Sequence, residues 1–234
     1  MDISGRKAVV FGGTSGIGLA VVRQLAEHGA TVVAISRNPS KAGPLPDGVT
    51  AMACDVLDRS ALADVFAACA PFDILVSAAT GGERAIGPFL SMDMDGFAAS
   101  FDKLWGYANV VRLGAEHLPD DGTIVLVSGS PARSVRPGMV AVGAAGAAVE
   151  SLARSVASEL APRRINVVAP GMIDTPMNPL QGAERVAAYA RSTAGHLIPR
   201  AGTPDEVAHA VLFAIQNDFV TGTTVDVDGG WLLS

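Results

Sequence analysis

The sequence has few aromatic residues, few lysines and only two cysteines. Aromatic residues make up 5% of the 234 positions and hydrophobic residues 49%, so the core must be built mainly from Ala, Val, Leu and Ile. Short aliphatic runs of this kind are typical of strands in a buried parallel sheet. Cys54 and Cys69 have no metal-ligand spacing and no partner cysteines, so we expect reduced thiols in a cytoplasmic protein and no metal site.

Clusters of basic residues and long apolar runs are missing as well. The formal net charge is −6, and the absence of any Lys/Arg cluster argues against nucleic acid as a partner. The first residues lack a basic segment followed by an apolar one, so no export signal is expected. The longest apolar stretch, 139–149, is too short and too rich in glycine to span a bilayer, so we expect no membrane partner.

Short aliphatic segments alternate with helix-length segments from one end of the chain to the other. Strands are expected at 7–11, 31–35, 50–53, 73–77, 123–127, 164–169 and 224–227. Helices are expected near 18–28, 59–69, 92–117, 140–160 and 205–216. This alternation predicts a single doubly wound α/β domain over 1–234, with a mostly parallel seven-stranded sheet and helices on both faces. The segment 176–199, interrupted by prolines and glycines, is expected to form a substrate lid above the sheet.

The first expected strand runs directly into a glycine-rich loop, which an expected helix follows. The loop is Gly12-Gly13-Thr14-Ser15-Gly16-Ile17-Gly18. Its glycines let the backbone approach a pyrophosphate without an intervening Cβ, and the helix N-terminus then points N–H groups at the anion. Glycine is common in ordinary turns, but the strand before this loop and the helix after it favour dinucleotide binding.

The spacing Gly-x-x-x-Gly-x-Gly resembles that of the short-chain dehydrogenase/reductase family, and the resemblance continues to the C-terminus. Asp55-Val56 matches the family's adenine-contacting Asp, although an Asp here could instead cap a turn. The segment 170–175 matches the family's nicotinamide-side loop, and 200–208 and 221–230 are similar to its last helix approach and final strand. The resemblance implies a Rossmann-type fold and a bound nicotinamide cofactor. The resemblance implies a set of cofactor-binding residues, to which we add Ser36 and Arg37 at the end of the second strand. The full set is Gly12, Thr14, Ser15, Gly16, Ile17, Gly18, Ser36, Arg37, Asp55, Val56, Ala78, Ala79, Pro170, Gly171, Ile173 and Thr175.

The end of the second strand bears on the choice between NADP and NAD. An NAD site places an acidic residue there to bind the ribose 2′-hydroxyl, but this chain has Ser36-Arg37. An arginine can bind a 2′-phosphate through two hydrogen bonds, whereas a carboxylate would repel the phosphate. We therefore expect NADP rather than NAD, the alternative being that Arg37 is an ordinary solvated loop residue.

The family's catalytic serine has a counterpart here, but its catalytic tyrosine and lysine have none. Ser130 matches the serine, with Ser128 as the other possible register. Val142 stands where the tyrosine is expected and Gly146 where the lysine is expected. A shift by one residue places Gly143 and Ala147 there instead, so no register restores either group.

Lys103 occupies the position at which the family carries an asparagine on the preceding long helix. Its side chain is expected to point toward Gly146, where glycine leaves room, and to bond the nicotinamide ribose or to act as an acid with a lowered pKa. Tyr107, one helical turn on, is expected to lie beside it. The alternative is a surface lysine on an amphipathic helix. Tyr189 and His196, in the expected lid, are the other candidate proton donors.

These observations support two kinds of function. The first is an NADP-dependent oxidoreductase that acts on an unidentified small carbonyl or alcohol, with a non-standard proton-transfer site built on Ser130 and Lys103. The second is a catalytically silent NADP-binding sensor or partner protein, which explains the retained glycine loop and the missing tyrosine and lysine equally well. The resemblance also implies a homodimer or homotetramer that pairs through the helix at 140–160 and the one before it.

Overall fold

The computed structural model describes residues 1–80 and 83–234. At its centre lies a seven-stranded sheet in the order β3-β2-β1-β4-β5-β6-β7, in which all neighbouring strands are parallel. The strands are β1 (Lys7–Phe11), β2 (Thr31–Ser36), β3 (Val49–Ala53), β4 (Ile74–Ser77), β5 (Thr123–Val127), β6 (Arg164–Pro170) and β7 (Thr224–Val227). The expected doubly wound Rossmann-type α/β fold is confirmed, with a sheet that is entirely rather than mostly parallel.

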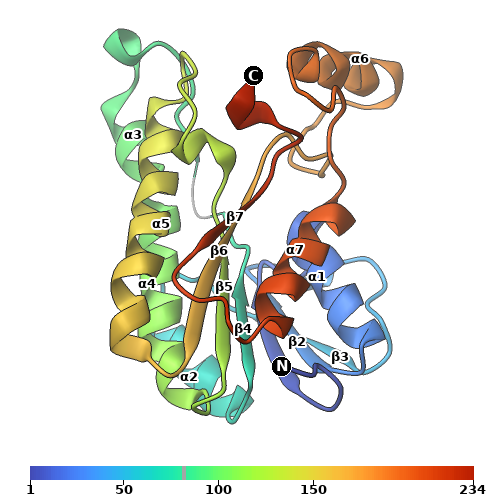
Figure 1. Ribbon diagram of the computed structural model, residues 1–234, viewed down its shortest axis with the longest axis vertical. Helices are drawn as coiled ribbons and strands as arrows, with labels where there is room; N and C mark the ends of the chain where they lie inside the picture. The colour runs from blue at the N-terminus through green and yellow to red at the C-terminus, as the bar shows by residue number, and fades with distance from the viewer. Residues whose placement is uncertain (81–82) are drawn as a thin grey trace.

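The helices cover both faces of this sheet (Figure 1). They are α1 (Gly16–Glu27), α2 (Arg59–Cys69), α3 (Met94–Ala99), α4 (Asp102–Gly114), α5 (Val140–Leu160), α6 (Gly182–Thr193) and α7 (Pro204–Gln216). α1 and α7 pack together on one face, whereas α4 packs between α2 and α5 on the other. Successive strand residues alternate between the two faces, as β geometry requires: Val9 and Phe11 belong to one core cluster, and Ala8 and Val10 to the other.

The prediction of a single helix over 92–117 is wrong, because the structure has two helices there, α3 and α4. Ser100 lies at the division. Its hydroxyl donates to the carbonyl of Gly96 at 2.9 Å and accepts from the amide of Ala85 at 3.0 Å. A serine side chain bonded to the backbone in this way competes with regular helix geometry. Hydrophobic periodicity does not report such a contact with a distant loop, so the sequence pattern missed the division.

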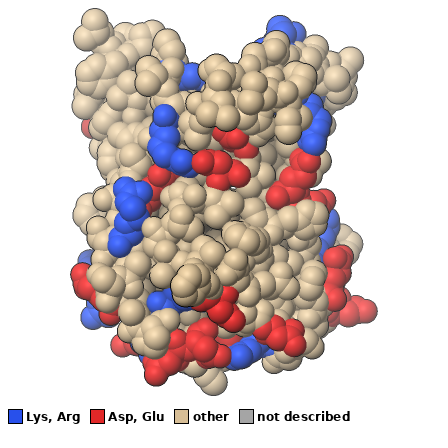
Figure 2. Space-filling view, viewed as in Figure 1, with Lys and Arg blue, Asp and Glu red and all other residues tan. Residues whose placement is uncertain are grey.

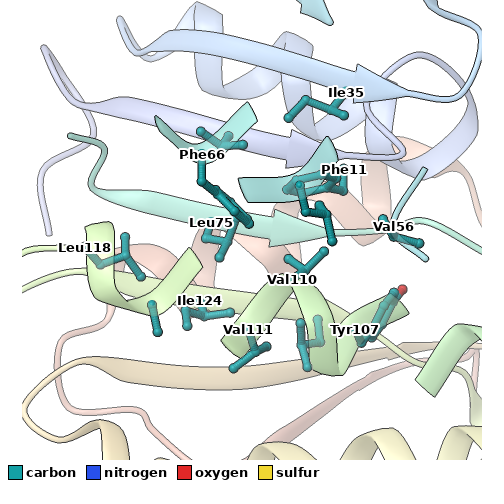
Figure 3. Packing of buried hydrophobic residues seen from close by; sticks show 14 of the residues in the cluster. Phe11, Ile35, Val56, Phe66, Leu75, Tyr107, Val110, Val111, Leu118 and Ile124 are labelled. Atoms are coloured by element: carbon teal, nitrogen blue, oxygen red, sulfur yellow. The ribbon is translucent and has the colours of Figure 1, made fainter. Parts of the chain in front are cut away.

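The core on the α4 side fixes this helix firmly against the sheet. Figure 3 shows Tyr107, Val110 and Val111 of α4 in the same cluster as Leu75 and Ile124 of the sheet. These side chains are buried almost completely. Burial of an aliphatic side chain contributes roughly 1.5–3 kcal/mol, so the cluster holds α4 in one position. The residues on the preceding turn of α4 are therefore held at a defined place relative to the strand ends.

One helix of the described residues, α5, is long and apolar enough to cross a membrane by length and composition alone. In the fold it packs against β6 and α4. Gly146, Val149 and Ala153 lie on its buried side. Its apolar character is therefore used in part by the core of this domain.

Candidate active site

A cleft of about 540 Å³ lies at the carboxyl ends of the strands. Figure 2 shows the surface hollowed between two lobes on this side of the molecule, one of which contains α6 in Figure 1. Residues after β1, β2, β4, β5 and β6 all line the cleft. Open parallel α/β sheets bind their ligands at this edge, where the strand order reverses between β1 and β4.

The glycine loop forms the wall of the cleft between β1 and α1, and all six of its predicted binding residues line the cleft. Gly12 has a φ of +76°, and a Cβ there would lie 2.7 Å from the carbonyl carbon of Ala78. A Cβ on Gly18 would overlap the carbonyl oxygen of Gly12. The side chain of Ser15, the N-cap of α1, makes no capping hydrogen bond. The loop thus presents an uncapped helix N-terminus without a Cβ barrier, which fits a dinucleotide pyrophosphate.

The end of the cleft beside β2 and β3 is lined by Ser36, Arg37 and Val56, as predicted, but not by Asp55. The Asp55 carboxylate accepts a hydrogen bond from the amide of Leu57 at 3.0 Å. This is the turn-capping role that the sequence left open, and the adenine contact of Asp55 stays a prediction. Arg37 lines the cleft with an exposed side chain.

The other end of the cleft contains the remaining predicted cofactor residues. Those that line it here are Ala78, Ala79, Pro170, Gly171, Ile173 and Thr175. A Cβ on Gly171 would lie 2.7 Å from the Cα of Asp228, so this glycine is required by the close approach of the turn after β7. The predicted set therefore shares one cleft, with Asp55 as its single exception.

Lys103 projects from the first turn of α4 into the cleft, where it is partly buried. Its ammonium donates a hydrogen bond to the carbonyl of Ser128 at 3.0 Å. Burial, and secondarily the charge of Arg84, lower the pKa of Lys103 to about 8. This placement excludes the alternative of a solvated surface lysine.

Tyr107 lies beside Lys103 as predicted, with its ring centroid 5.6 Å from the Lys103 ammonium. It does not line the cleft. Its hydroxyl donates to the carbonyl of Val127 at 2.9 Å, and burial raises its pKa far above the ordinary value. Tyr107 therefore supports Lys103 from the core and is not a candidate proton donor.

The structure does not place Ser130 in the cleft, so the prediction that it faces a substrate is wrong about its position. Ser130 begins a short 3-10 turn (Ser130–Ala132), is completely buried, and its hydroxyl has no hydrogen-bond partner among the described residues. Ser128, the other register, lines the cleft together with Gly129. The Ser128 hydroxyl donates to the carbonyl of Gly146 at 3.1 Å. The serine that contacts the cleft is therefore Ser128.

Val142 and Gly146 both line the cleft, so no proton-transfer group stands at either position. The expectation that Gly146 leaves room is only partly met. A Cβ on Gly146 would lie 3.1 Å from the Cβ of Ala132 and 3.3 Å from the Ser128 hydroxyl oxygen. Ala132 and Ser128 thus take up part of the space beside Gly146, and Lys103 bonds the carbonyl of Ser128 rather than entering that space.

The expected lid segment carries α6, and Met177, Asn178 and Tyr189 of this segment line the cleft. The Tyr189 hydroxyl donates to the carbonyl of Ile173 at 3.4 Å. His196 does not line the cleft; it stacks on Trp231, which does, with ring centroids 5.5 Å apart. Of the two lid candidates, only Tyr189 is therefore in a position to contact a substrate.

Several lining residues were not among the binding residues predicted from the sequence. They are Cys54, Thr80, Arg84, Ile86, Ser100, Met139, Met172, Pro176, Asn178 and Trp231. Thr80, Arg84 and Ile86 follow β4, and loops after the carboxyl ends of parallel strands are the general location of binding residues. Trp231 follows the last strand by only four residues, and nothing in its local sequence indicates that the chain folds back over the cleft.

A doubly wound parallel sheet with a glycine loop after β1 and a cleft at the strand ends defines the dinucleotide-binding class of α/β fold. The family described as enoyl-(acyl carrier protein) reductase matches residues 12–232. This chain belongs to the short-chain dehydrogenase/reductase family, whose members are NAD(P)-dependent oxidoreductases.

Relatives match over nearly their whole length. The cyclic-di-GMP-binding biofilm dispersal mediator protein of Escherichia coli (strain K12) is 33% identical over 97% of this chain and 98% of its own. The 3-oxoacyl-(acyl-carrier-protein) reductase FabG of Thermotoga maritima is 32% identical over 100% of both chains. A small-chain dehydrogenase solved in complex with NADPH has a TM-score of 0.87 and 33% identity, covering 99% of this chain and 100% of that one.

Proposed function

We propose that the protein is an NADP(H)-dependent reductase or dehydrogenase of a small carbonyl or alcohol, with Lys103 as the proton donor and acceptor. One observation carries this proposal. The Lys103 ammonium lies in the cleft at 3.0 Å from the Ser128 carbonyl, and its pKa is lowered to about 8. A general acid is most effective when its pKa lies near the working pH, which an ordinary lysine does not provide.

The proton step follows from this geometry. A reduced nicotinamide supplies a hydride to the carbonyl carbon of a substrate. The Lys103 ammonium then donates a proton to the carbonyl oxygen, which completes the alcohol and leaves a neutral amine that regains its proton from solvent. The Ser128 carbonyl holds the amine in place during this exchange. In the oxidative direction the neutral amine accepts the hydroxyl proton.

The preference for NADP over NAD is part of the same proposal. Arg37 lies at the rim of the cleft directly after β2, and no carboxylate of the described residues lines this end. The related dehydrogenase that was solved with NADPH supports this choice. A guanidinium at this place binds a 2′-phosphate and has no comparable partner in NADH.

The proposal is tested by following NADPH oxidation with a panel of ketones and aldehydes. Lys103→Met is expected to lower the rate of turnover by about 10²–10⁴-fold, the usual effect of losing a general acid. Lys7→Met makes the same chemical change at the amino end of β1, away from the cleft, and is the matched control. If both variants turn over at the same rate as the wild type, Lys103 is not the proton donor.

A catalytically silent NADP(H)-binding protein is the second candidate. It is favoured by Val142 and Gly146, which line the cleft without an ionisable group. The similar Escherichia coli protein is named for binding and mediation rather than for a reaction. Submicromolar binding of NADPH with no turnover of any carbonyl compound favours this candidate over the first.

We also propose that the protein forms a homodimer or a homotetramer. Trp105 of α4 is 62% exposed and Val140 of α5 is 44% exposed, which leaves apolar surface on neighbouring helices. Ala147 is also exposed on α5. Small side chains at such a surface let two helices approach closely.

A further inference from the structure

The lining of the cleft is positively charged although the whole chain is acidic. Three cationic side chains line it, Arg37, Arg84 and Lys103, and no Asp or Glu does among residues 1–80 and 83–234. The formal net charge of the chain is −6. Arg37 and Arg84 are exposed and make no ion pair with a described residue, so both guanidinium groups are open to an anionic ligand. The lining therefore suggests more anion binding than a neutral substrate requires.

Arg37 and the glycine loop account for the phosphates of a dinucleotide, but they are remote from the other two cations. Arg37 follows β2, whereas Lys103 is bonded to Ser128 after β5. In this sheet β1 and β4 lie between those two strands, which gives three strand spacings, or about 14 Å. Lys103 and Arg84 thus form a separate positive region at the substrate end, and Arg84 is near enough for its charge to lower the pKa of Lys103.

The loop that carries Arg84 is held at two points. The amide of Ala85 donates to the Ser100 hydroxyl at 3.0 Å, at the division between α3 and α4. The amide of Gly87 donates to the carbonyl of Gly138 at 2.9 Å, just before α5. The exposed Arg84 guanidinium contacts the thioether of Met177 and makes no ion pair with a described residue. It is therefore a positioned cation that lacks a protein anion.

Apolar residues surround this positive region. Ile86, Met139, Val142, Met177 and Trp231 line the same end of the cleft. An apolar wall with a few placed polar groups is the usual construction of a small-molecule site. The combination suits a compound with a short apolar body and one anionic group, in addition to the carbonyl that reacts.

We infer that the substrate is an anionic carbonyl compound, whose carboxylate or phosphate group binds to Arg84 while its carbonyl oxygen faces Lys103. This inference rests on the proposed function for the reaction, but the binding of the anion does not depend on turnover. Arginine binds both kinds of anion through two parallel hydrogen bonds, so the two sources share one recognition chemistry.

The experiment compares matched ligands on the NADPH-bound protein. The carboxylate pairs are 2-oxohexanoate and 4-oxopentanoate, each against its methyl ester, and the phosphate pair is dihydroxyacetone phosphate against dihydroxyacetone. Binding is read from the fluorescence of bound NADPH, and turnover from its oxidation. We expect at least one anion to bind about 10- to 100-fold more tightly than its neutral partner, as a charge-assisted hydrogen bond provides.

Arg84→Gln is expected to remove this preference, Arg84→Lys to keep part of it, and Arg23→Gln to leave it unchanged. Arg23 is an exposed arginine of α1 and matches the loss of charge. NADPH affinity should stay the same in all three variants, and raising the salt concentration should weaken the binding of each anionic carbonyl compound more than that of its neutral partner. The pair that shows the preference identifies carboxylate or phosphate as the group bound.

The inference is overturned by equal binding of anions and their neutral partners to the wild type, or by a loss of NADPH affinity in Arg84→Gln. Turnover confined to the neutral compounds also overturns it, while the proposed function stands. Binding of anions without any turnover supports anion binding at Arg84 but contradicts the proposed reductase function. The two proposals therefore fail in different ways.

Discussion

The ammonium of Lys103 and the carbonyl of Ser128 are joined by a hydrogen bond of 3.0 Å, which links α4 to the end of β5 inside the cleft. The hydroxyl of the same serine donates to the carbonyl of Gly146 on α5. Ser128 thus connects Lys103 with α5, whose cleft-lining residues carry no ionisable group. This connection makes Lys103 the group whose titration should control the chemistry.

The first prediction concerns pH. The pKa of Lys103 is lowered to about 8, and the ammonium is the form that donates a proton. The rate of carbonyl reduction at saturating NADPH should therefore be highest below about pH 8 and fall about tenfold for each pH unit above it. Alcohol oxidation should show the opposite dependence, because it needs the neutral amine. Single-turnover rates across this range test both, and a profile that persists unchanged in Lys103→Met assigns the titration to another group.

The second prediction concerns the cofactor. Arg37→Gln should weaken NADPH binding by about 10- to 100-fold, the usual effect of removing a charge-assisted hydrogen bond, and leave NADH binding nearly unchanged. Fluorescence titration of both cofactors measures this directly. Equal losses for NADPH and NADH would show that Arg37 does not distinguish them.

The fold could be predicted from the sequence because its signals are local and repeated. Most strands are short aliphatic runs, and Gly12 and Gly18 of the glycine loop each have a steric requirement. Asp55 and Ser130 show where this reasoning ends. Each sits in the expected segment, but Asp55 bonds the Leu57 amide and Ser130 turns into the core. A shift of one or two residues in a loop reverses which side chain faces a cleft, and neither periodicity nor spacing determines it.

Arg84 and Trp231 illustrate a different limit. Both line the cleft, yet they come from segments with no motif, and their positions depend on contacts between distant parts of the chain. The Arg84 loop is held by Ser100 and Gly138, and Trp231 stacks on His196 from the lid segment. Such long-range contacts exist only once the sheet has assembled, so the sequence pattern does not contain them.

The third prediction compares Gly12 of the glycine loop with Gly48 outside it, and so separates the effect of backbone strain from that of steric overlap. Gly12 and Gly48 have φ values of +76° and +78°, but a Cβ would meet the backbone of Ala78 only at Gly12, and nothing within 4 Å at Gly48. Both Gly→Ala variants should lose about 1–3 kcal/mol of unfolding free energy through backbone strain. Gly12→Ala should lose more, and it alone should lose NADPH affinity. Urea unfolding and cofactor titration test the pair; similar behaviour of the two variants would argue against a cofactor role for Gly12.

The fourth prediction tests the proposed oligomer. Ala147→Arg places a charge on the exposed side of α5, and we expect it to convert a dimer or tetramer to a smaller species. Ala190→Arg makes the same change on the exposed surface of α6 and should leave the assembly intact. Light scattering after gel filtration gives the masses. A wild-type protein that is already monomeric contradicts the proposal.

The last prediction concerns His196, which connects the lid segment to the C-terminal turn. Its ring stacks on Trp231, and the Arg136 guanidinium lies 4.4 Å from the centroid of the same indole. The Nη2 of Arg136 is 3.4 Å from Nε2 of His196. Burial, and then the charge of Arg136, lower the pKa of His196, while the charge of Asp228 opposes them with a smaller effect. The folded state therefore favours the neutral imidazole.

A group whose pKa is lower in the folded than in the unfolded state contributes stability above its unfolded pKa, which for histidine is about 6.5. That contribution is lost as the pH falls through the folded value. The unfolding free energy of the wild type should therefore decrease between about pH 7 and 5 more steeply than that of His196→Gln, whose side chain does not titrate. Urea unfolding at several pH values gives both slopes. Equal slopes would mean that the stack of His196, Trp231 and Arg136 accepts the imidazolium at no cost.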